Sequence, residues 1–379
     1  MKPRVLHVIA GLGIGGAEMA LFRLVASSRG GDYSHAVVAL TSGGAMQQRF
    51  DEAGIELVEF DFKRAPISQF FRLVALMRQR RPDIVQTWMY HADLLGGVAA
   101  WLTGNRNVIW GVHSTSVRSG GTSGFTRVVQ RLCAWVSNYV PHTIVCVADA
   151  SRRAHADAGY DIRRMVVVPN GFEISQLVAT AEQRLMLRSQ CGFGVDDVVI
   201  GSLGRFNLDK DPDNFVSAAA ILASHQPQVR FLMVGKGLDT CNAELAAWID
   251  RTGYRDRFVL LGERSDVPIC LAAMDIFCLH SRTEAFPLVL GEAMAMGLPC
   301  VTTDVGDASL MIADAGVVVA KQDPRSLAQG LADVLRMTPA KRRDMGCRAK
   351  ARVHAEFTMD RARKNFETIY QRITAESRS

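Results

Sequence analysis

The chain has 379 residues, a length that predicts two or three domains, each large enough to bury a core of its own. Hydrophobic residues make up 48% and charged residues 22%, which excludes disordered, fibrous and coiled-coil proteins. The formal net charge is +6, and residues 1–175 carry this surplus, with 19 Lys and Arg against 13 Asp and Glu. Either this is random surface charge, or it predicts an anionic partner such as a phospholipid surface or a lipid-linked phosphate. Nucleic acid is not expected, because the basic residues are not interleaved with aromatic ones.

Short apolar runs and scattered cysteines favour a cytoplasmic protein. No apolar run reaches the ~18 residues that a membrane-spanning helix needs. The run that begins at Val5 is short and leads into a glycine loop, so we interpret it as a buried strand, not as a signal peptide. The eight cysteines form no Cys-x-x-Cys pair, which indicates reduced thiols and neither disulfides nor a zinc site.

Short apolar runs alternate with longer amphipathic stretches along most of the chain. In the first half the pattern predicts strands at residues 5–10, 35–40, 83–87, 107–112, 143–147 and 165–168, and helices at 17–27, 46–53, 69–80, 94–102, 125–140 and 149–158. In the second half it predicts strands at residues 198–203, 230–234, 259–261, 276–280 and 300–302, and helices at 215–224, 238–252, 267–273 and 288–296. This alternation indicates parallel sheets with helices on both faces.

The predicted fold class is therefore α/β, with two Rossmann-like, doubly wound domains that face a central cleft. We expect an N-terminal domain at residues 1–170, a linker at 171–195 and a second domain at 196–355. The tail, residues 356–379, is expected to form a helix that packs back across the N-terminal domain.

A glycine-rich loop follows the first strand. Gly11, Gly13 and Gly16 match the dinucleotide-binding pattern Gly-x-Gly-x-x-Gly. That function needs an acidic residue after the second strand, where the chain has Thr41-Ser42-Gly43-Gly44, so an NAD enzyme is not expected. The loop instead predicts either a phosphate at the N-terminus of the following helix or a simple tight turn.

Two cations follow the first strand of the second half, Arg205 and Lys210. Arg offers a fork of donors for phosphate oxygens and Lys offers a point charge, although both are common surface residues. Asp209 and Asp211 flank Lys210, and we interpret them as a local charge balance and not as metal ligands.

A second anion site is predicted near residue 287. Pro287 suits the first position of a helix, whose N-terminal N–H groups, near Phe286, Leu288 and Val289, could bind a diphosphate. Glu284 precedes this helix.

Glu292 lies about 7–8 Å along the axis of that helix, so Glu284 and Glu292 do not form the ~5 Å pair of a retaining glycosidase. For either glutamate taken singly, a capping or surface role is the alternative.

These motifs together resemble glycosyltransferase family 4, whose members are retaining enzymes of GT-B fold. The likeness rests on Glu-x7-Glu at residues 284 and 292, the Ala-Met-Ala-x-Gly-x-Pro segment that follows, and Gly-Arg…Lys at 204–210. Gly-Gly-Ala-Glu at 15–18 and Val-Pro-Asn-Gly at 168–171 extend it over nearly the whole chain.

The resemblance implies a role for each candidate residue. Arg205 and Lys210 would hold the donor diphosphate, Glu292 the donor ribose, and Glu284 the donor sugar close to the reacting carbon. Gly15 and Gly16 would close on the distal phosphate. His113 would contact the donor sugar, although a lone loop histidine could equally bond the backbone.

The chain departs from the family pattern in one place. Where the family often has Glu-Gly-Phe-Gly, this chain has Glu284-Ala285-Phe286-Pro287, and the proline removes one backbone donor. Activity is still expected, because both cations and the other N–H groups remain.

The expected reaction is transfer of a sugar, with retention, from a nucleotide diphosphate sugar, most readily a UDP-sugar. No metal and no other cofactor are implied. The donor would bind the second domain, and the acceptor would enter over the N-terminal domain. The acceptor would be a saccharide or a lipid-linked saccharide in exopolysaccharide or cell-envelope assembly, with contact between the chain and an anionic membrane. The alternatives are another GT-B activity, such as a nucleotide-sugar epimerase, or a non-catalytic nucleotide-sugar-binding protein.

Overall fold

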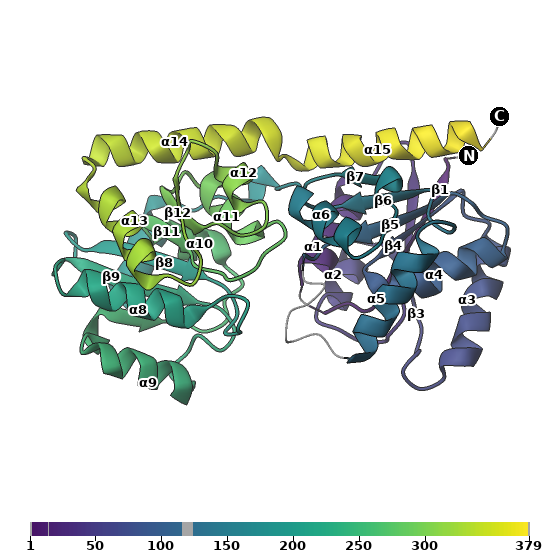
Figure 1. The fold of residues 1–379 in the computed structure, drawn as a ribbon. Coiled ribbons are helices and arrows are strands. Elements are labelled where there is room, and N and C mark those ends of the chain that lie inside the picture. Colours follow the sequence, from purple (N-terminus) through teal and green to yellow (C-terminus); the bar gives the residue numbers. More distant parts are fainter. Residues whose placement is uncertain (1, 14, 116–123, 378–379) are drawn as a thin grey trace. The chain divides into compact units, whose positions relative to one another are not determined.

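The computed structural model describes residues 2–13, 15–115 and 124–377, which form two compact α/β units (Figure 1). Unit 1 comprises Met1–Gly171 together with Met359–Ser379, and unit 2 comprises Phe172–Thr358. Each unit is built on a parallel sheet, which confirms the predicted α/β class. None of the described helices is long and apolar enough to cross a membrane.

Unit 1 contains a seven-stranded sheet in the order β3-β2-β1-β4-β5-β6-β7. Its strands are β1 (Arg4–Ile9), β2 (Ser34–Ala39), β3 (Glu56–Glu59), β4 (Ile84–Trp88), β5 (Val108–Val112), β6 (Thr143–Cys146) and β7 (Met165–Val167). The residues of β4, β5 and β6 are all buried, because helices cover both faces of a parallel sheet.

Two groups of helices cover the two faces of the unit 1 sheet. Residues of α3 (Pro66–Arg80), α4 (Tyr90–Leu102) and α5 (Gly124–Val136) share one core cluster. Residues of α1 (Gly16–Ser27), α2 (Gln47–Glu52) and α15 (Met359–Glu376) share the other. The connection from β6 to β7 contains α6 (Asp149–Asp157).

Unit 2 contains a six-stranded sheet in the order β10-β9-β8-β11-β12-β13. Its strands are β8 (Val198–Leu203), β9 (Val229–Val234), β10 (Phe258–Leu260), β11 (Ile276–Leu279), β12 (Cys300–Thr303) and β13 (Val317–Val319). Its helices are α7 (Ala181–Gln190), α8 (Pro212–Ala223), α9 (Ala243–Thr252), α10 (Val267–Ala272), α11 (Leu288–Ala295), α12 (Ala308–Ile312), α13 (Pro324–Arg336) and α14 (Pro339–Glu356).

The strand order reverses once in each sheet. In unit 1, β1 lies between β2 and β4, and in unit 2, β8 lies between β9 and β11. The two neighbouring connections leave the central strand in opposite directions, which opens a crevice beyond the carboxyl ends of the strands where ligands bind in such sheets. The loops after β1 and β8 are therefore the first places to look for a site.

One predicted helix is shorter than the sequence pattern suggested. The stretch 238–252 is helical only from Ala243, because Gly235 and Gly237 adopt positive φ angles and Asn242 caps the helix. The Asn242 side chain accepts hydrogen bonds from the N–H groups of Glu244 and Leu245, which satisfies two donors of the first turn.

Candidate nucleotide-sugar site

The loops after β8 and β11 are joined at the carboxyl edge of the unit 2 sheet. The backbone N–H of Arg282 donates to the carbonyl of Asp209 over 2.8 Å, and the Arg282 guanidinium pairs with Asp211 over 2.7 Å. These contacts fix the loop that carries Lys210 against the loop that carries Glu284.

Lys210 and Glu284 form an ion pair across this junction. Glu284 also accepts a 2.7 Å hydrogen bond from the Ser281 hydroxyl. The side chains of Lys210 and Glu284 retain 21% and 13% of their exposure, so a solvent-borne ligand can reach both. The structure thus brings together two residues 74 positions apart that the sequence assigned to one ligand.

Asp211 holds an unusual backbone position at the start of α8. Its φ of 54° lies in the left-handed region, where non-glycine residues are strained by roughly 1–3 kcal/mol. The Asp211 carbonyl accepts a 3.1 Å bond from His280, whose other ring nitrogen lies 2.5 Å from the Ser202 hydroxyl. Asp211 thus pairs with Arg282, while Lys210 pairs with Glu284.

The N-terminus of α11 opens at the same edge. The helix begins at Leu288, and Pro287 occupies the N-cap position, so the prediction of Pro287 at the first helical position is wrong by one residue. The extended ψ of Pro287, 100°, keeps it outside the helix. The N–H groups of Leu288 and Val289 come too early in the helix to have an intrahelical acceptor, which leaves them for an anion.

Phe286 contributes backbone rather than side chain to this edge. Its ring is buried, stacks on Phe172 with the ring centroids 6.1 Å apart, and makes an edge-to-face contact with Phe357 at 5.6 Å. This packing anchors the residue that precedes Pro287.

Glu292 is nine-tenths buried on α11, four residues after the start of the helix. A surface role for Glu292 is therefore excluded. Glu284 and Glu292 belong to the loop and the helix respectively, as the sequence predicted.

A third cation at this edge was missed. Lys236 is exposed in the loop after β9, and its carbonyl accepts a 2.8 Å bond from the N–H of Phe206, next to the exposed Arg205. A side chain at Gly235 would lie 1.8 Å from the carbonyl of Gly204, so only glycine permits this approach. The signal was present as Gly-Lys-Gly directly after a predicted strand.

The glycine loop of unit 1 lies at the carboxyl edge of its own sheet, with Ile14 outside the described residues. Gly15 caps α1 in an extended conformation, and Gly16 is the first residue of the helix. The side chain of Glu18 folds back over Gly15, so a Cβ at Gly15 would clash with the Glu18 carboxylate. The positive end of α1 therefore already has a carboxylate beside it.

His113 follows β5 at the same edge of unit 1. Its ring stacks on Trp88 at 4.9 Å, and its Nδ1 is enclosed without a hydrogen-bond partner among the described residues. Burial lowers the pKa of His113 to about 4, so the imidazole is neutral at neutral pH. The unsatisfied Nδ1 argues against the backbone-bonding alternative for this histidine.

Two family models match successive parts of the chain. "Glycosyltransferase Family 4" matches residues 14–176, and "Glycosyl transferases group 1" matches residues 185–352. The chain belongs to glycosyltransferase family 4.

Among curated relatives, a galactosyltransferase from Escherichia coli is 26% identical over 243 residues. It is a UDP-Gal:alpha-D-GlcNAc-diphosphoundecaprenol alpha-1,3-galactosyltransferase, and the match covers 63% of this chain and 62% of that enzyme. An N-acetyl-alpha-D-glucosaminyl L-malate synthase from Bacillus anthracis is 28% identical over 52% of this chain and 51% of its own length. The chain thus spans between half and two thirds of the length of these relatives.

Solved structures support the GT-B fold over nearly the whole chain. Anabaena HepE in complex with UDP matches with a TM-score of 0.85 at 22% identity, covering 96% of this chain and 98% of HepE. Sucrose-phosphate synthase from Thermosynechococcus elongatus matches with a TM-score of 0.78 at 17% identity, covering 98% of this chain and all of that one.

The predicted site residues of this family 4 chain fall into two sets. Seven lie at the carboxyl edge of unit 2 or on α11: Arg205, Lys210, Glu284, Phe286, Leu288, Val289 and Glu292. Three lie at the carboxyl edge of unit 1: Gly15, Gly16 and His113.

Proposed function

We propose that the chain transfers a sugar from a UDP-sugar to a saccharide or lipid-linked acceptor in exopolysaccharide or cell-envelope assembly. The observation that carries this proposal is the Lys210–Glu284 ion pair beside the N-terminus of α11. A cation, a carboxylate and free N–H groups at one sheet edge are what a diphosphate-linked sugar requires. The UDP bound to HepE and the UDP-galactose named for the E. coli relative favour uridine.

In this proposal, donor binding divides the ion pair. Lys210 turns to the diphosphate, with Arg205, Lys236 and the N–H groups of Leu288 and Val289. Glu284 stays on the Ser281 hydroxyl and accepts from the hydroxyls of the donor sugar. Glu292 holds the ribose.

The transfer breaks the bond between the anomeric carbon and the diphosphate oxygen, which leaves with the electron pair. The acceptor oxygen bonds to the same face of that carbon, so the configuration is retained. The acceptor proton passes to the departing phosphate oxygen, whose charge the cations and α11 stabilise. This scheme needs no metal ion. His113, neutral at neutral pH, hydrogen-bonds the sugar through Nδ1, and Gly15 and Gly16 approach the distal phosphate.

The acceptor is proposed to be carried by a lipid at the cytoplasmic face of a membrane. The basic surplus of residues 1–175 and the undecaprenol-linked acceptor named for the E. coli relative support this.

The test is an assay of UDP release from a panel of UDP-, GDP- and ADP-sugars, with and without a lipid-linked saccharide acceptor. We expect acceptor-dependent release from one UDP-sugar and a product whose anomeric configuration, read by NMR, matches that of the donor. Glu284→Gln and Lys210→Ala should each lower kcat/KM by 10²-fold or more, in the range reported for single stabilising groups. Arg251→Ala, an exposed arginine of α9, is the control.

Three outcomes would reject the proposal. Conversion of the donor to an epimer without an acceptor would indicate a nucleotide-sugar epimerase. Donor binding without turnover would indicate a non-catalytic protein. Full activity of both variants would show that the site is elsewhere.

A further inference from the structure

The outer face of α5 carries an unusual stripe of exposed apolar side chains. Phe125, Val128, Leu132, Trp135 and Tyr139 are exposed by 70%, 52%, 45%, 68% and 65%. Their spacing of 3, 4, 3 and 4 residues places them along one side of the helix and its C-terminal turn. The opposite side, with Val129, Gln130, Cys133 and Ala134, is buried. We call this exposed row the α5 stripe.

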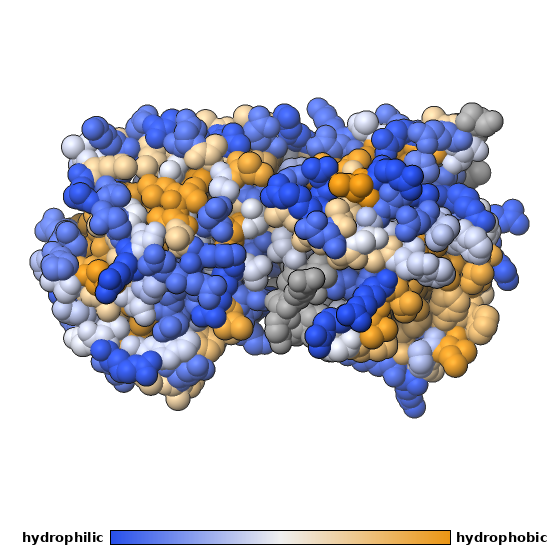
Figure 2. Space-filling model, viewed as in Figure 1, coloured by the Kyte–Doolittle hydropathy of each residue, from blue (hydrophilic) through white to orange (hydrophobic). Residues whose placement is uncertain are grey.

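Arginines border the α5 stripe, and acidic residues are absent from its helix. Arg127 and Arg131 are exposed on α5 itself, between the apolar positions. Neither α3 nor α5 contains an acidic residue, and the single one in α4, Asp93, is buried. Residues 62–148 hold ten Lys and Arg but two acidic residues, Asp83 and Asp93. Figure 2 shows hydrophobic and hydrophilic surface side by side over the region of unit 1 where Figure 1 places α5.

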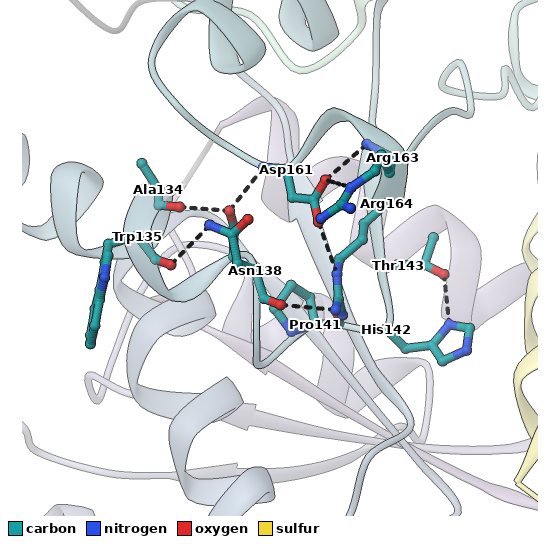
Figure 3. Close-up of polar contacts among 10 residues, drawn as sticks. Ala134, Trp135, Asn138, Pro141, His142, Thr143, Asp161, Arg163 and Arg164 are labelled. Carbon is teal, nitrogen blue, oxygen red and sulfur yellow. Dashed lines mark hydrogen bonds and ion pairs between the residues drawn. The ribbon is translucent and has the colours of Figure 1, made fainter.

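A second pair of arginines secures the C-terminal end of α5 (Figure 3). Arg164 donates to the carbonyls of Asn138 and Pro141, and both Arg163 and Arg164 pair with the buried carboxylate of Asp161. Asp161 is itself tied to the helix, because its N–H donates to the Ser137 hydroxyl over 3.0 Å. Figure 3 shows the Trp135 indole turned away from this cluster.

The segment that carries this cluster also has two exposed side chains. The Arg163 side chain is 81% exposed, and the neighbouring Ile162 is 53% exposed.

We propose that the α5 stripe is a docking surface for an anionic lipid bilayer. Trp and Tyr favour the boundary between headgroups and acyl chains, and arginines beside them attract anionic headgroups. A second copy of this chain fits less well, because a twofold contact through the stripe would bring the same arginines together.

The position of the stripe links it to the proposed acceptor, and in this respect the inference rests on the proposed function. The N-terminal end of α5 lies at the carboxyl edge of the sheet, where Phe125 stacks on His91 at 5.8 Å. His113 follows β5 at that same edge. A bilayer on the stripe therefore brings lipid headgroups to this edge of unit 1, the unit over which the acceptor is expected to enter.

The test is flotation of the full chain with vesicles of phosphatidylcholine, with or without phosphatidylglycerol and without any acceptor or donor. We expect binding only to the anionic vesicles, and we expect salt to weaken it. Arg127→Gln with Arg131→Gln should lower the partition coefficient about 30-fold, from the usual contribution of two arginines at an anionic surface. Leu132→Ser with Trp135→Ser should abolish detectable binding.

Two double variants in unit 2 serve as matched controls. Leu185→Ser with Met186→Ser removes two apolar residues of α7 that are 63% and 62% exposed. Arg251→Gln with Arg343→Gln removes two exposed arginines and thus the same net charge. Both should bind vesicles like the parent chain.

Tryptophan fluorescence gives a readout that does not depend on the folding of the serine variant. The Trp135 emission should shift to shorter wavelength with anionic vesicles, and Trp135→Phe should lose this shift while still floating. Equal binding of parent and stripe variants would overturn the proposal. So would a dimer of the parent chain that Leu132→Ser with Trp135→Ser dissociates, since the stripe would then be a protein interface.

The same preparation separates this inference from the proposed function. Vesicle binding without stabilisation by UDP would keep the docking surface and reject the donor site. Stabilisation by UDP without vesicle binding would keep the donor site and reject the docking surface.

Discussion

Asp211 combines backbone strain with a structural ion pair. Its left-handed φ is tolerated by Asn and Gly far better than by Ala, and its carboxylate holds Arg282. Both properties act on the adjacent Lys210.

We therefore expect Asp211→Ala to lower the free energy of unfolding by about 1–3 kcal/mol and to raise the KM for the donor. Asp211→Asn keeps the conformation and a hydrogen-bond acceptor. Its free energy of unfolding and its KM for the donor should therefore stay close to those of the parent chain. Denaturant unfolding and steady-state kinetics on the two variants decide this. Identical behaviour of Ala and Asn would show that neither strain nor pairing positions Lys210.

Asp93 is a buried carboxyl group, and the Thr87 hydroxyl donates to one of its oxygens over 2.6 Å. Burial raises the pKa of Asp93 to about 7, above its ordinary value of 3.8. Because the folded state holds this proton more tightly than the unfolded state, the group's contribution to stability is present at low pH. That contribution is lost as the pH rises from about 4 to about 7.

Asp93→Asn should thus stabilise the chain relative to the parent at pH 8 but much less at pH 5. The difference in the free energy of unfolding between Asp93→Asn and the parent should grow with rising pH by at most about 1.4 kcal/mol per pH unit. Urea unfolding at the two pH values measures it, with the exposed Asp157→Asn as a control. A pH-independent difference would contradict the raised pKa.

Much of the candidate site could be predicted from single residues, but its support could not. Arg205, Lys210, Glu284 and Glu292 stand in motifs whose spacing is visible in the sequence. The bond from Arg282 to Asp211 joins residues 71 positions apart, and nothing local to either one predicts it.

At the scale of elements, α15 completes the core of unit 1. Phe366, Tyr370 and Ile373 are buried in it, and the Tyr370 hydroxyl donates to the buried amide of Gln86 on β4. The Gln86 nitrogen has no partner among the described residues, so this hydroxyl is an important contact of the side chain.

Tyr370→Phe should lower the free energy of unfolding by about 1–3 kcal/mol, because it leaves a buried acceptor unsatisfied. Tyr370→Phe combined with Gln86→Leu should recover part of this loss, since no polar group then remains unpaired. Equilibrium unfolding of the single and double variants tests the pair. No loss in Tyr370→Phe would mean that water replaces the hydroxyl.

The long buried strands, the main helices and two short edge strands, β7 and β10, could be predicted, whereas the edge strands β3 and β13 could not. Residues 56–59 and 317–319 form these two edge strands, of four and three residues. Their pairing with β2 and β12 creates them. By contrast, the start of α13 has a clear sequence signal, with Asp323 at the N-cap and Pro324 as the first helical residue.

At the scale of the whole molecule, the two units have separate cores, and most of the proposed donor-binding residues belong to unit 2. We expect two thermal transitions. UDP should raise the midpoint temperature of the unit 2 transition, because it binds the folded state of that unit. Tyr370→Phe should lower the midpoint of the other transition, and Lys210→Ala should reduce the shift in midpoint that UDP causes. Differential scanning calorimetry gives both midpoints. A single transition, or equal shifts of both, would contradict this assignment.

The chain leaves unit 1 at Gly171 and returns to it at Met359, so unit 2 is an insertion in unit 1. The ribosome makes the whole of unit 2 before it makes α15. At roughly 5–20 residues per second, the first 171 residues wait about 10–40 s for the helix that covers Tyr33, Trp88 and their neighbours. During synthesis, the second unit to be made can therefore finish folding first, while the first still exposes an apolar face to chaperones.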